Sequence, residues 1–165
     1  MQMMKKWLAL VLALVMMPAC IPAVAENPLF EGTWVQFEGG FEIYCPVDWV
    51  EYEVTEEEKA QGIIYTAGSG DETRLMQLGW YALPQEVTID AMQAALAQSF
   101  VIVEKVKVNG IDLLCAGDAD YDSLMFVALS EGEPGYYMFV FTPMSDTVLQ
   151  GYAAAIAGSL RTIQK

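Results

Sequence analysis

The stretch VEKVKVNGIDLLCA, residues 103–116, decides the fold. Its centre, Asn109-Gly110, is suited to the positive φ values of a type I′ turn, and apolar-rich runs flank it on both sides. Such a two-residue turn fixes the register of the strands that it joins. The expected opposite pairs are Val108 with Ile111, Lys107 with Asp112, and Val106 with Leu113. One face of the hairpin is then apolar and the other carries a charge pair, as in an antiparallel sheet.

Further strands are expected along the chain, most of them joined by tight turns. They are predicted at 33–37, 41–45, 50–54, 62–67, 75–83, 124–129 and 136–142. Because tight hairpins can join only antiparallel neighbours, the sheet should be mainly antiparallel.

Three helix signals interrupt the strands. Residues 55–58 match a capping box for a short helix, and Thr88 is the expected cap of a helix that runs to about Phe100. Ser145 or Asp146 caps a final helix. The inward residues of that helix are expected to be Leu149, Tyr152, Ile156, Leu160 and Ile163. The fold class is therefore α+β, a mainly antiparallel sheet with helices packed on it.

The composition excludes several classes of protein. The chain has 165 residues and is 55% hydrophobic, which is not the composition of a disordered chain. A formal net charge of −14 argues against nucleic acid as a partner, because phosphate binding needs clustered Lys and Arg. The sequence contains no His, which excludes His-based triads, His general bases and most catalytic zinc sites.

Residues 1–25 have the features of an export signal. Lys5 and Lys6 form a positive n-region, and residues 7–17 form an apolar segment that is too short to span a bilayer. Ala23-Val24-Ala25 supplies the small-x-small site that a signal peptidase reads. The sequence therefore predicts export.

Cleavage after this site leaves residues 26–165 as one secreted domain, in which no segment is long and apolar enough to cross a membrane. The cleavage removes two basic residues and no acids, so the formal charge falls from −14 to −16. The alternative is a lipoprotein anchored through Cys20. The preceding residues 17–19 match a lipobox poorly, because an aliphatic residue three positions earlier and a small residue two positions earlier are expected.

Cys45 and Cys115 remain after cleavage, both on apolar strand segments. In an exported protein they would form one disulfide. Its loop of about 70 residues corresponds to about 4 kcal/mol of stabilisation in the chain-entropy model. The alternative is two buried free thiols that act as small apolar side chains.

Asp118, Asp120 and Asp122 are the most suggestive cluster of chemistry-bearing residues. Alternating acids in a turn offer several oxygens to Ca²⁺, which makes Ca²⁺ the one cofactor that the sequence favours. The segment does not match an EF-hand loop, since Ser123 stands where Gly is needed and Leu129 stands where Glu is needed. The alternative is a solvated hairpin end between two strands.

The sequence contains no catalytic constellation. Its serines have no His partner, and no Gly-x-Ser-x-Gly elbow occurs. A carboxylate-based hydrolase needs two carboxylates at a set separation, and with 22 acids any such match has little specificity. Trp and Tyr are numerous on the predicted strands. Tyr44 and Tyr81 would be exposed as a binding surface if helices covered one side of the sheet, and would belong to the core if helices covered both.

The segment Gly-Phe-x-Ile-x-x-Pro-x-x-Trp at residues 40–49 opens an ordered series of elements. A long strand, a Thr-capped helix, a β-meander and a closing helix follow. Residues 33–163 resemble in order and spacing the PsbP-like fold, an α/β/α sandwich. That fold is shared by the extrinsic oxygen-evolving protein of photosystem II, a Ran-binding nuclear import factor and bacterial exported proteins similar to DcrB and LpqN. The resemblance implies a non-catalytic binding or accessory protein and assigns no site residues.

We therefore expect a secreted, non-catalytic binding or accessory protein of the cell envelope, whose partner is a protein or a small ligand. The first alternative is a Ca²⁺-dependent binding module that uses Asp118, Asp120 and Asp122. The second is a carboxylate-based hydrolase.

Overall fold

The computed structural model describes residues 29–163. The predicted export signal at residues 1–25 and the alternative lipid anchor at Cys20 lie outside the described residues. The strands are β1 (Gly32–Phe37), β2 (Phe41–Pro46), β3 (Trp49–Tyr52), β4 (Ile63–Ser69), β5 (Leu75–Ala82), β6 (Val101–Val108), β7 (Ile111–Asp118), β8 (Ser123–Leu129), β9 (Gly135–Thr142) and β10 (Arg161–Thr162). The helices are α2 (Glu56–Ala60), α3 (Ile89–Leu96) and α4 (Thr147–Gly158).

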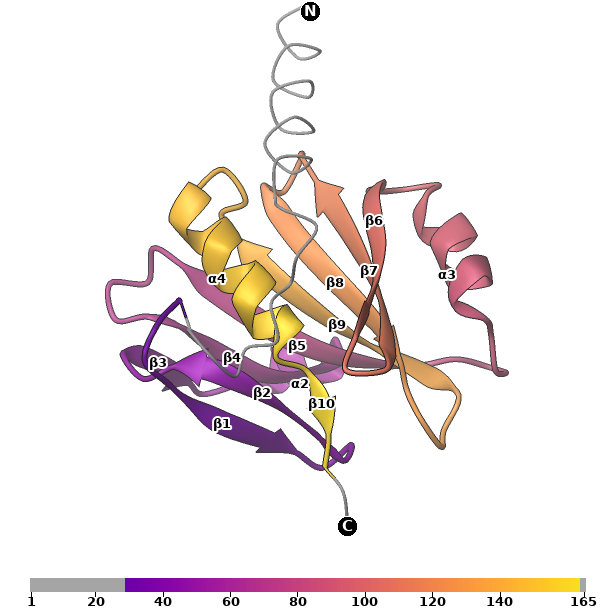
Figure 1. Ribbon diagram of the computed structural model, residues 1–165, viewed down its shortest axis with the longest axis horizontal. Helices are drawn as coiled ribbons and strands as arrows, with labels where there is room; N and C mark the ends of the chain where they lie inside the picture. The colour runs from indigo at the N-terminus through magenta and orange to yellow at the C-terminus, as the bar shows by residue number, and fades with distance from the viewer. Residues whose placement is uncertain (1–28, 164–165) are drawn as a thin grey trace, which may run out of the picture.

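The strands form two sheets. Seven of them form a large sheet in the order β3-β4-β5-β9-β8-β7-β6, and three form a small sheet in the order β1-β2-β10. Every strand pair is antiparallel, which confirms the predicted α+β class. The small sheet and α4 cover one face of the large sheet, whereas α3 packs on the other face beside β6 and β7 (Figure 1).

The hairpin at residues 103–116 has the predicted register. Val108 lies opposite Ile111, Lys107 opposite Asp112, and Val106 opposite Leu113. Asn109 and Gly110 take positive φ values of 49° and 88°, as a type I′ turn requires. The pairing shifts by a bulge between Ile102 and Glu104. The local sequence therefore determines this pair of strands up to the bulge.

The helices begin where their capping residues predict. Thr55 and Glu58 form the complete capping box of α2. The Thr88 side chain accepts a hydrogen bond from the backbone N–H of Ala91 at the start of α3. Asp146, one of the two predicted caps, accepts from the first turn of α4. Each cap satisfies N–H groups that have no partner within the helix.

Two helices end earlier than predicted. The helix expected to reach Phe100 ends at Leu96. The final helix ends at Gly158, because Ser159 accepts a hydrogen bond from the backbone N–H of Tyr44 on β2 (2.7 Å) and donates one to the carbonyl of Ile156 (2.6 Å). The chain then becomes extended and pairs with β2 as β10, so the prediction that the helix includes residues 160–163 is wrong.

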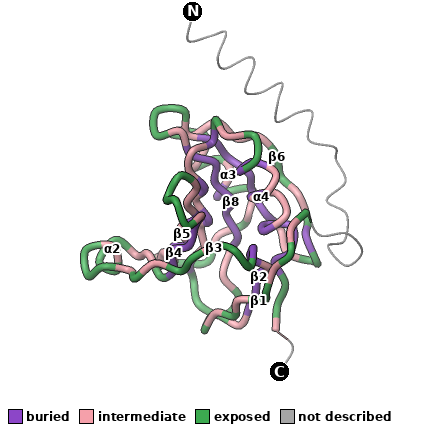
Figure 2. The backbone as a smooth tube through the Cα atoms, turned by 90° about the vertical axis from the view of Figure 1, so that its left-hand side faces the viewer, coloured by how far each residue is buried: buried purple, intermediate pink, exposed green. Residues whose placement is uncertain are grey.

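The main core fills the space between the large sheet on one side and the small sheet with α4 on the other. Its fully buried side chains include Ile43, Leu78, Phe139, Phe141 and Ile156. A smaller cluster of Met92, Leu114 and Val127 lies under α3 on the opposite face. In Figure 2 the buried backbone concentrates in the middle strands, whereas α2 projects from the body and is mostly exposed.

Tyr44 and Tyr81 are half-buried, so neither is a free surface side chain. The Tyr44 ring stacks on Phe30 with the ring centroids 5.8 Å apart, and Tyr81 stacks on Tyr136 at 5.1 Å. Tyr44 lies on β2 of the small sheet and Tyr81 on β5 of the large sheet, and these ring contacts contribute to the burial of each side chain. Among the helices of residues 29–163, none has the length and apolar character needed to cross a membrane.

Candidate functional site

A pocket of about 220 Å³ opens between the two sheets, at the end of the molecule where β10 pairs with the start of β2. Aromatic side chains from β2 and β9 form part of its wall, namely Phe41, Tyr137 and Phe139. Ala128 and Leu160 are also buried lining residues, with exposed fractions of 3% each. The lining is therefore mainly apolar, as in most small-molecule sites.

The strand register explains why space is left here. On the core face of β8 and β9, Leu124 lies opposite Phe141 and Phe126 lies opposite Phe139, so large side chains fill the middle of the core. The next pair along the same face is Ala128 opposite Tyr137. The small alanine side chain does not fill the width of the space between the sheets, and a pocket results at this end.

The aromatic wall is held by ring contacts and by a glycine. Phe41 meets Tyr137 edge to face with the centroids 4.5 Å apart, and it meets Phe139 at 6.3 Å. At Gly39, in the turn between β1 and β2, an added Cβ would lie 2.0 Å from the Tyr137 hydroxyl oxygen. No side chain fits there without moving the tyrosine, so Gly39 lets the Tyr137 ring take its place in the wall.

The rim of the pocket carries a negative charge. Glu131, from the loop between β8 and β9, and Thr162, on β10, are both exposed and both line the pocket. Arg161 is the neighbour of Thr162 in the chain, but its guanidinium binds Glu42 at 2.6 Å and stacks 3.5 Å from the Trp34 ring centroid. The Arg161 guanidinium is thus engaged with Glu42, and Glu131 is the one charged residue among the lining residues.

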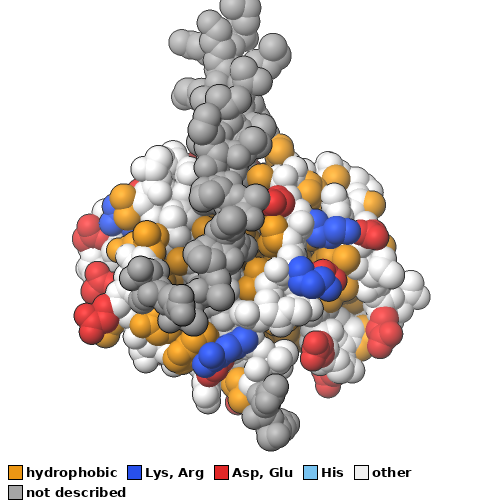
Figure 3. Space-filling view, in the orientation of Figure 1, with side chains coloured by type: hydrophobic (Ala, Val, Ile, Leu, Met, Phe, Trp, Pro, Cys, Tyr) orange, Lys and Arg blue, Asp and Glu red, His pale blue; other side chains and the backbone are white. Residues whose placement is uncertain are grey.

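The basic side chains of the described residues are all engaged in ion pairs with acidic ones. Each of the Lys and Arg side chains within residues 29–163 forms an ion pair with a carboxylate; the basic partners are Lys59, Arg74, Lys105, Lys107 and Arg161. In Figure 3 the basic side chains appear as a few separate spots beside acidic ones. The many remaining acids give this protein a negative field, which attracts cations and repels anions.

A second pocket, of about 210 Å³, lies on the other side of the loop between β8 and β9. Its lining includes Glu86 and Val87, from the segment before α3, and Glu133 and Pro134, from the loop. Leu129, at the end of β8, lines both pockets. The acidic loop that follows it lies between a pocket on the core face of the sheet and one on the opposite face.

The predicted Ca²⁺ ligands lie in and beside the turn between β7 and β8, at the opposite end of these strands. Asp118 Oδ1 accepts hydrogen bonds from the backbone N–H groups of Asp120 (3.0 Å) and Tyr121 (3.3 Å), whereas the Asp120 side chain is exposed. Within residues 29–163 the structure shows no group of three or more His, Cys, Asp or Glu residues suited to hold a metal ion. The Ca²⁺ site stays a prediction.

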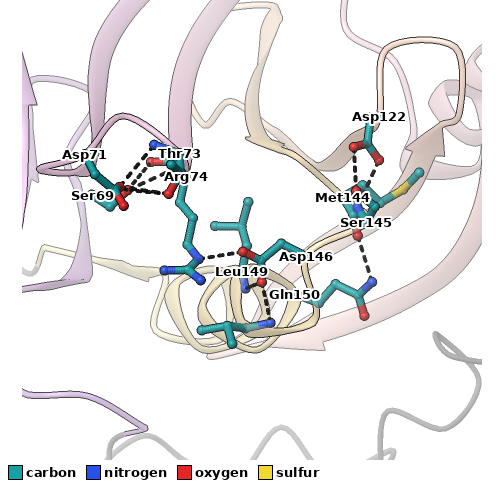
Figure 4. Close-up of polar contacts among 11 residues, drawn as sticks. Ser69, Asp71, Thr73, Arg74, Asp122, Met144, Ser145, Asp146, Leu149 and Gln150 are labelled. Carbon is teal, nitrogen blue, oxygen red and sulfur yellow. Dashed lines mark hydrogen bonds and ion pairs between the residues drawn. The ribbon is translucent and has the colours of Figure 1, made fainter.

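Asp122 forms structural hydrogen bonds that the sequence does not predict. Its carboxylate accepts hydrogen bonds from the backbone N–H (2.9 Å) and the hydroxyl (2.7 Å) of Ser145, and its carbonyl accepts from Met144 N–H (2.6 Å) (Figure 4). Its φ of 49° is in the left-handed region, which Asp tolerates better than most residues. Asp122 thus ties the turn between β7 and β8 to the loop before α4.

Figure 4 also shows a second tie to the start of α4. Arg74 donates to Asp146 at 2.7 Å, so the turn before β5 is joined to the residue that caps the helix. In that turn, hydrogen bonds from Ser69 and Thr73 lower the pKa of Asp71 to about 2. The carboxylates of this region are engaged in turns and caps, an arrangement that stabilises loops.

Cys45 and Cys115 are both buried free thiols in the structure, on β2 and β7. Burial raises the pKa of each thiol to about 12, because the charged thiolate is unfavourable in an apolar environment. Neither thiol is a nucleophile at neutral pH. The disulfide between them stays a prediction.

The sequence does not predict the pocket. It predicts that the aromatic lining residues lie on strands, but no local pattern shows that β10 exists or that Ala128 lies opposite Tyr137. The signal that was present is the decreasing size of Phe126 and Ala128 along one face of the predicted strand 124–129.

Comparison with known proteins shows likeness in fold at low sequence identity. No protein family model matches the chain. A search of curated proteins finds no match. Among solved structures, the solution structure of cyanobacterial PsbP (CyanoP) from Synechocystis sp. PCC 6803 matches with a TM-score of 0.54 and 13% identity, over 88% of this chain and 99% of that one. A crystal structure from Bacteroides thetaiotaomicron VPI-5482 matches with a TM-score of 0.55 and 14% identity, over 82% of this chain.

These matches show the class of fold. The chain has a PsbP-like α+β fold, as the resemblance of residues 33–163 predicted. It spans half the length of the Bacteroides protein.

Proposed function

We propose that the protein is an exported, non-catalytic binding or accessory protein of the cell envelope, which takes a small apolar ligand between its two sheets. One observation carries the proposal. Most of the side chains that line the pocket of about 220 Å³ are aromatic or aliphatic, and Thr162 and Glu131 add polar groups at its rim. Ligand sites commonly combine an apolar lining with a small number of polar groups in this way.

The chemistry of the lining supports binding rather than catalysis. The lining contains no Cys, His or Lys, and its one carboxylate, Glu131, has no carboxylate partner among the lining residues. Acid–base hydrolysis of glycosides needs two such groups. Export is supported by the features of residues 1–25, and the proposal includes a likeness to exported bacterial proteins of the DcrB and LpqN type.

The size of the pocket sets the size of the ligand. An apolar cavity of about 150 Å³ binds benzene, so a pocket of about 220 Å³ accommodates a group somewhat larger than one aromatic ring. Benzene is therefore a suitable first probe. Its binding is followed by the backbone amide chemical shifts of the ¹⁵N-labelled protein.

The expected result is a saturable set of shifts at residues that line the pocket, such as Phe41, Ala128 and Tyr137. Thr162→Trp places a large side chain at the rim and should weaken the binding that these shifts report at least about tenfold. Thr33→Trp makes the same change at an exposed position of β1 outside the pocket and should leave them unchanged. An absence of saturable shifts, or shifts that survive Thr162→Trp undiminished, contradicts the proposal.

A further inference from the structure

Three aromatic rings line the pocket in different orientations. The planes of Phe41 and Tyr137 are inclined by 60°, and those of Phe41 and Phe139 by 77°. Aromatic faces carry negative potential and attract cations, and groups of aromatic rings are used to recognise quaternary ammonium ligands. Phe41 and Phe139 are buried and Tyr137 is half-buried, so Tyr137 is the most accessible ring of the wall. This ring suits a ligand that is apolar in shape and positive in charge.

The electrostatics of the rim favour the same sign. Glu131 is the one charged residue among the lining residues, and no Lys or Arg within residues 29–163 forms an ion pair with it. Arg161, the chain neighbour of the lining residue Thr162, is bound by Glu42 and Trp34. The Glu131 carboxylate would repel an anionic ligand and attract a cationic one.

The lining also limits the kind of cation. A metal ion such as Ca²⁺ needs six to eight oxygen ligands, but Glu131 is the one carboxylate among the lining residues. An alkylated ammonium needs no such ligand set, because its positive charge is spread over methyl groups that pack against aromatic rings. Such an ion keeps both its apolar surface and its charge satisfied in this pocket.

We propose that the pocket between the two sheets binds a small organic cation, an alkylated ammonium. Its alkyl groups pack against Tyr137, beside the buried ring of Phe41, and its charge faces Glu131. This inference rests on the proposed function, since it names the class of ligand for the same pocket. Choline, with about seven non-hydrogen atoms, is of suitable size by the comparison with benzene.

The test compares two probes of the same shape. Choline and 3,3-dimethylbutan-1-ol differ in that a carbon atom replaces the charged nitrogen. Their dissociation constants are measured by titration of the ¹⁵N-labelled protein at low ionic strength. Choline should bind about tenfold more tightly, which is the order expected for a cation over aromatic rings in a partly desolvated site. This advantage should decrease as salt is added, because the rim is exposed to solvent.

Two variants with a matched control locate the recognition. Glu131→Gln should weaken choline about three- to tenfold and leave the alcohol unchanged. Glu133→Gln changes an exposed glutamate of the same loop that lines the other pocket, and it should leave both probes unchanged. Tyr137→Leu keeps an apolar wall without the aromatic ring and should reduce the preference for choline at least about threefold.

The outcomes separate the inference from the proposed function. If both probes bind in the pocket with equal affinity, or if Glu131→Gln has no more effect than Glu133→Gln, the cation inference is overturned while the pocket remains a binding site. If benzene binds and neither of these probes does, the inference is likewise overturned. If none of the three probes binds, both the cation inference and the proposed function are contradicted.

Discussion

Gly39→Ala offers a sharp test of the pocket wall. The new Cβ would lie 2.0 Å from the hydroxyl oxygen of Tyr137, 2.8 Å from its Cζ and 3.0 Å from Cε1 of Phe41. To restore an ordinary contact of about 3.5 Å, the Tyr137 ring must withdraw by more than about 1 Å, and its packing on Phe41 is then disturbed. Overpacking of this kind costs about 1–3 kcal/mol of unfolding free energy.

Equilibrium urea unfolding measures this cost, and a double-mutant cycle assigns it. Tyr137→Leu removes the ring that clashes, so the cost of Gly39→Ala should fall by at least about 1 kcal/mol in that background. Gly70→Ala is the control, because its nearest neighbour is 3.9 Å away and the change should stay within about 0.5 kcal/mol. The reasoning is refuted if Gly39→Ala is as mild as the control, or if its cost is the same with and without Tyr137.

Three further predictions concern the residues singled out in the sequence. Asp122→Ala should lower the free energy of unfolding by about 1–3 kcal/mol, because two hydrogen bonds to Ser145 are lost. In the same urea experiment Asp120→Ala should change it by less than about 0.5 kcal/mol, and equal effects would contradict the assignment. The calcium hypothesis predicts that millimolar CaCl₂ raises Tm and that Asp120→Ala abolishes the rise; an unchanged Tm removes that hypothesis. Free buried thiols have a pKa of about 12 in the folded protein against the usual 9.0, so the folded state retains their protons longer and stability should fall between pH 9 and 12. The expected slope is at most about 1.4 kcal/mol per pH unit for each thiol. Unfolding measured against pH for the wild type and for Cys45→Ala/Cys115→Ala checks it, since a disulfide-bonded wild type would show no such difference in slope.

The sequence predicts the parts of the fold that local chemistry determines. Asn109-Gly110 fixes the register of β6 and β7, because only residues that tolerate positive φ fit a type I′ turn. The caps at Thr55, Thr88 and Asp146 were predictable for a similar reason, since each side chain satisfies N–H groups of its own helix.

The features that sequence could not predict depend on contacts between distant segments. β10 has two residues, and the contacts that hold it beside β2 come from distant segments: Ser159 binds the backbone of β2, and Arg161 pairs with Glu42. The sequence therefore predicts a longer final helix than α4, which ends at Gly158. The acidic turn shows the same limit, because Asp122 binds Ser145 across 23 positions of sequence, and no local pattern reveals that partner. The pocket depends on both the strand register and the position of β10.

The most direct test of the central claim is the dissociation constant of one apolar probe for the wild type and for Thr162→Trp. The account predicts that benzene shifts the amides of pocket residues in the wild type, and that the tryptophan at the rim weakens this binding at least about tenfold while Thr33→Trp does not. Equal binding to all three proteins, or no binding to the wild type, would contradict the claim that the space between the two sheets is a ligand site.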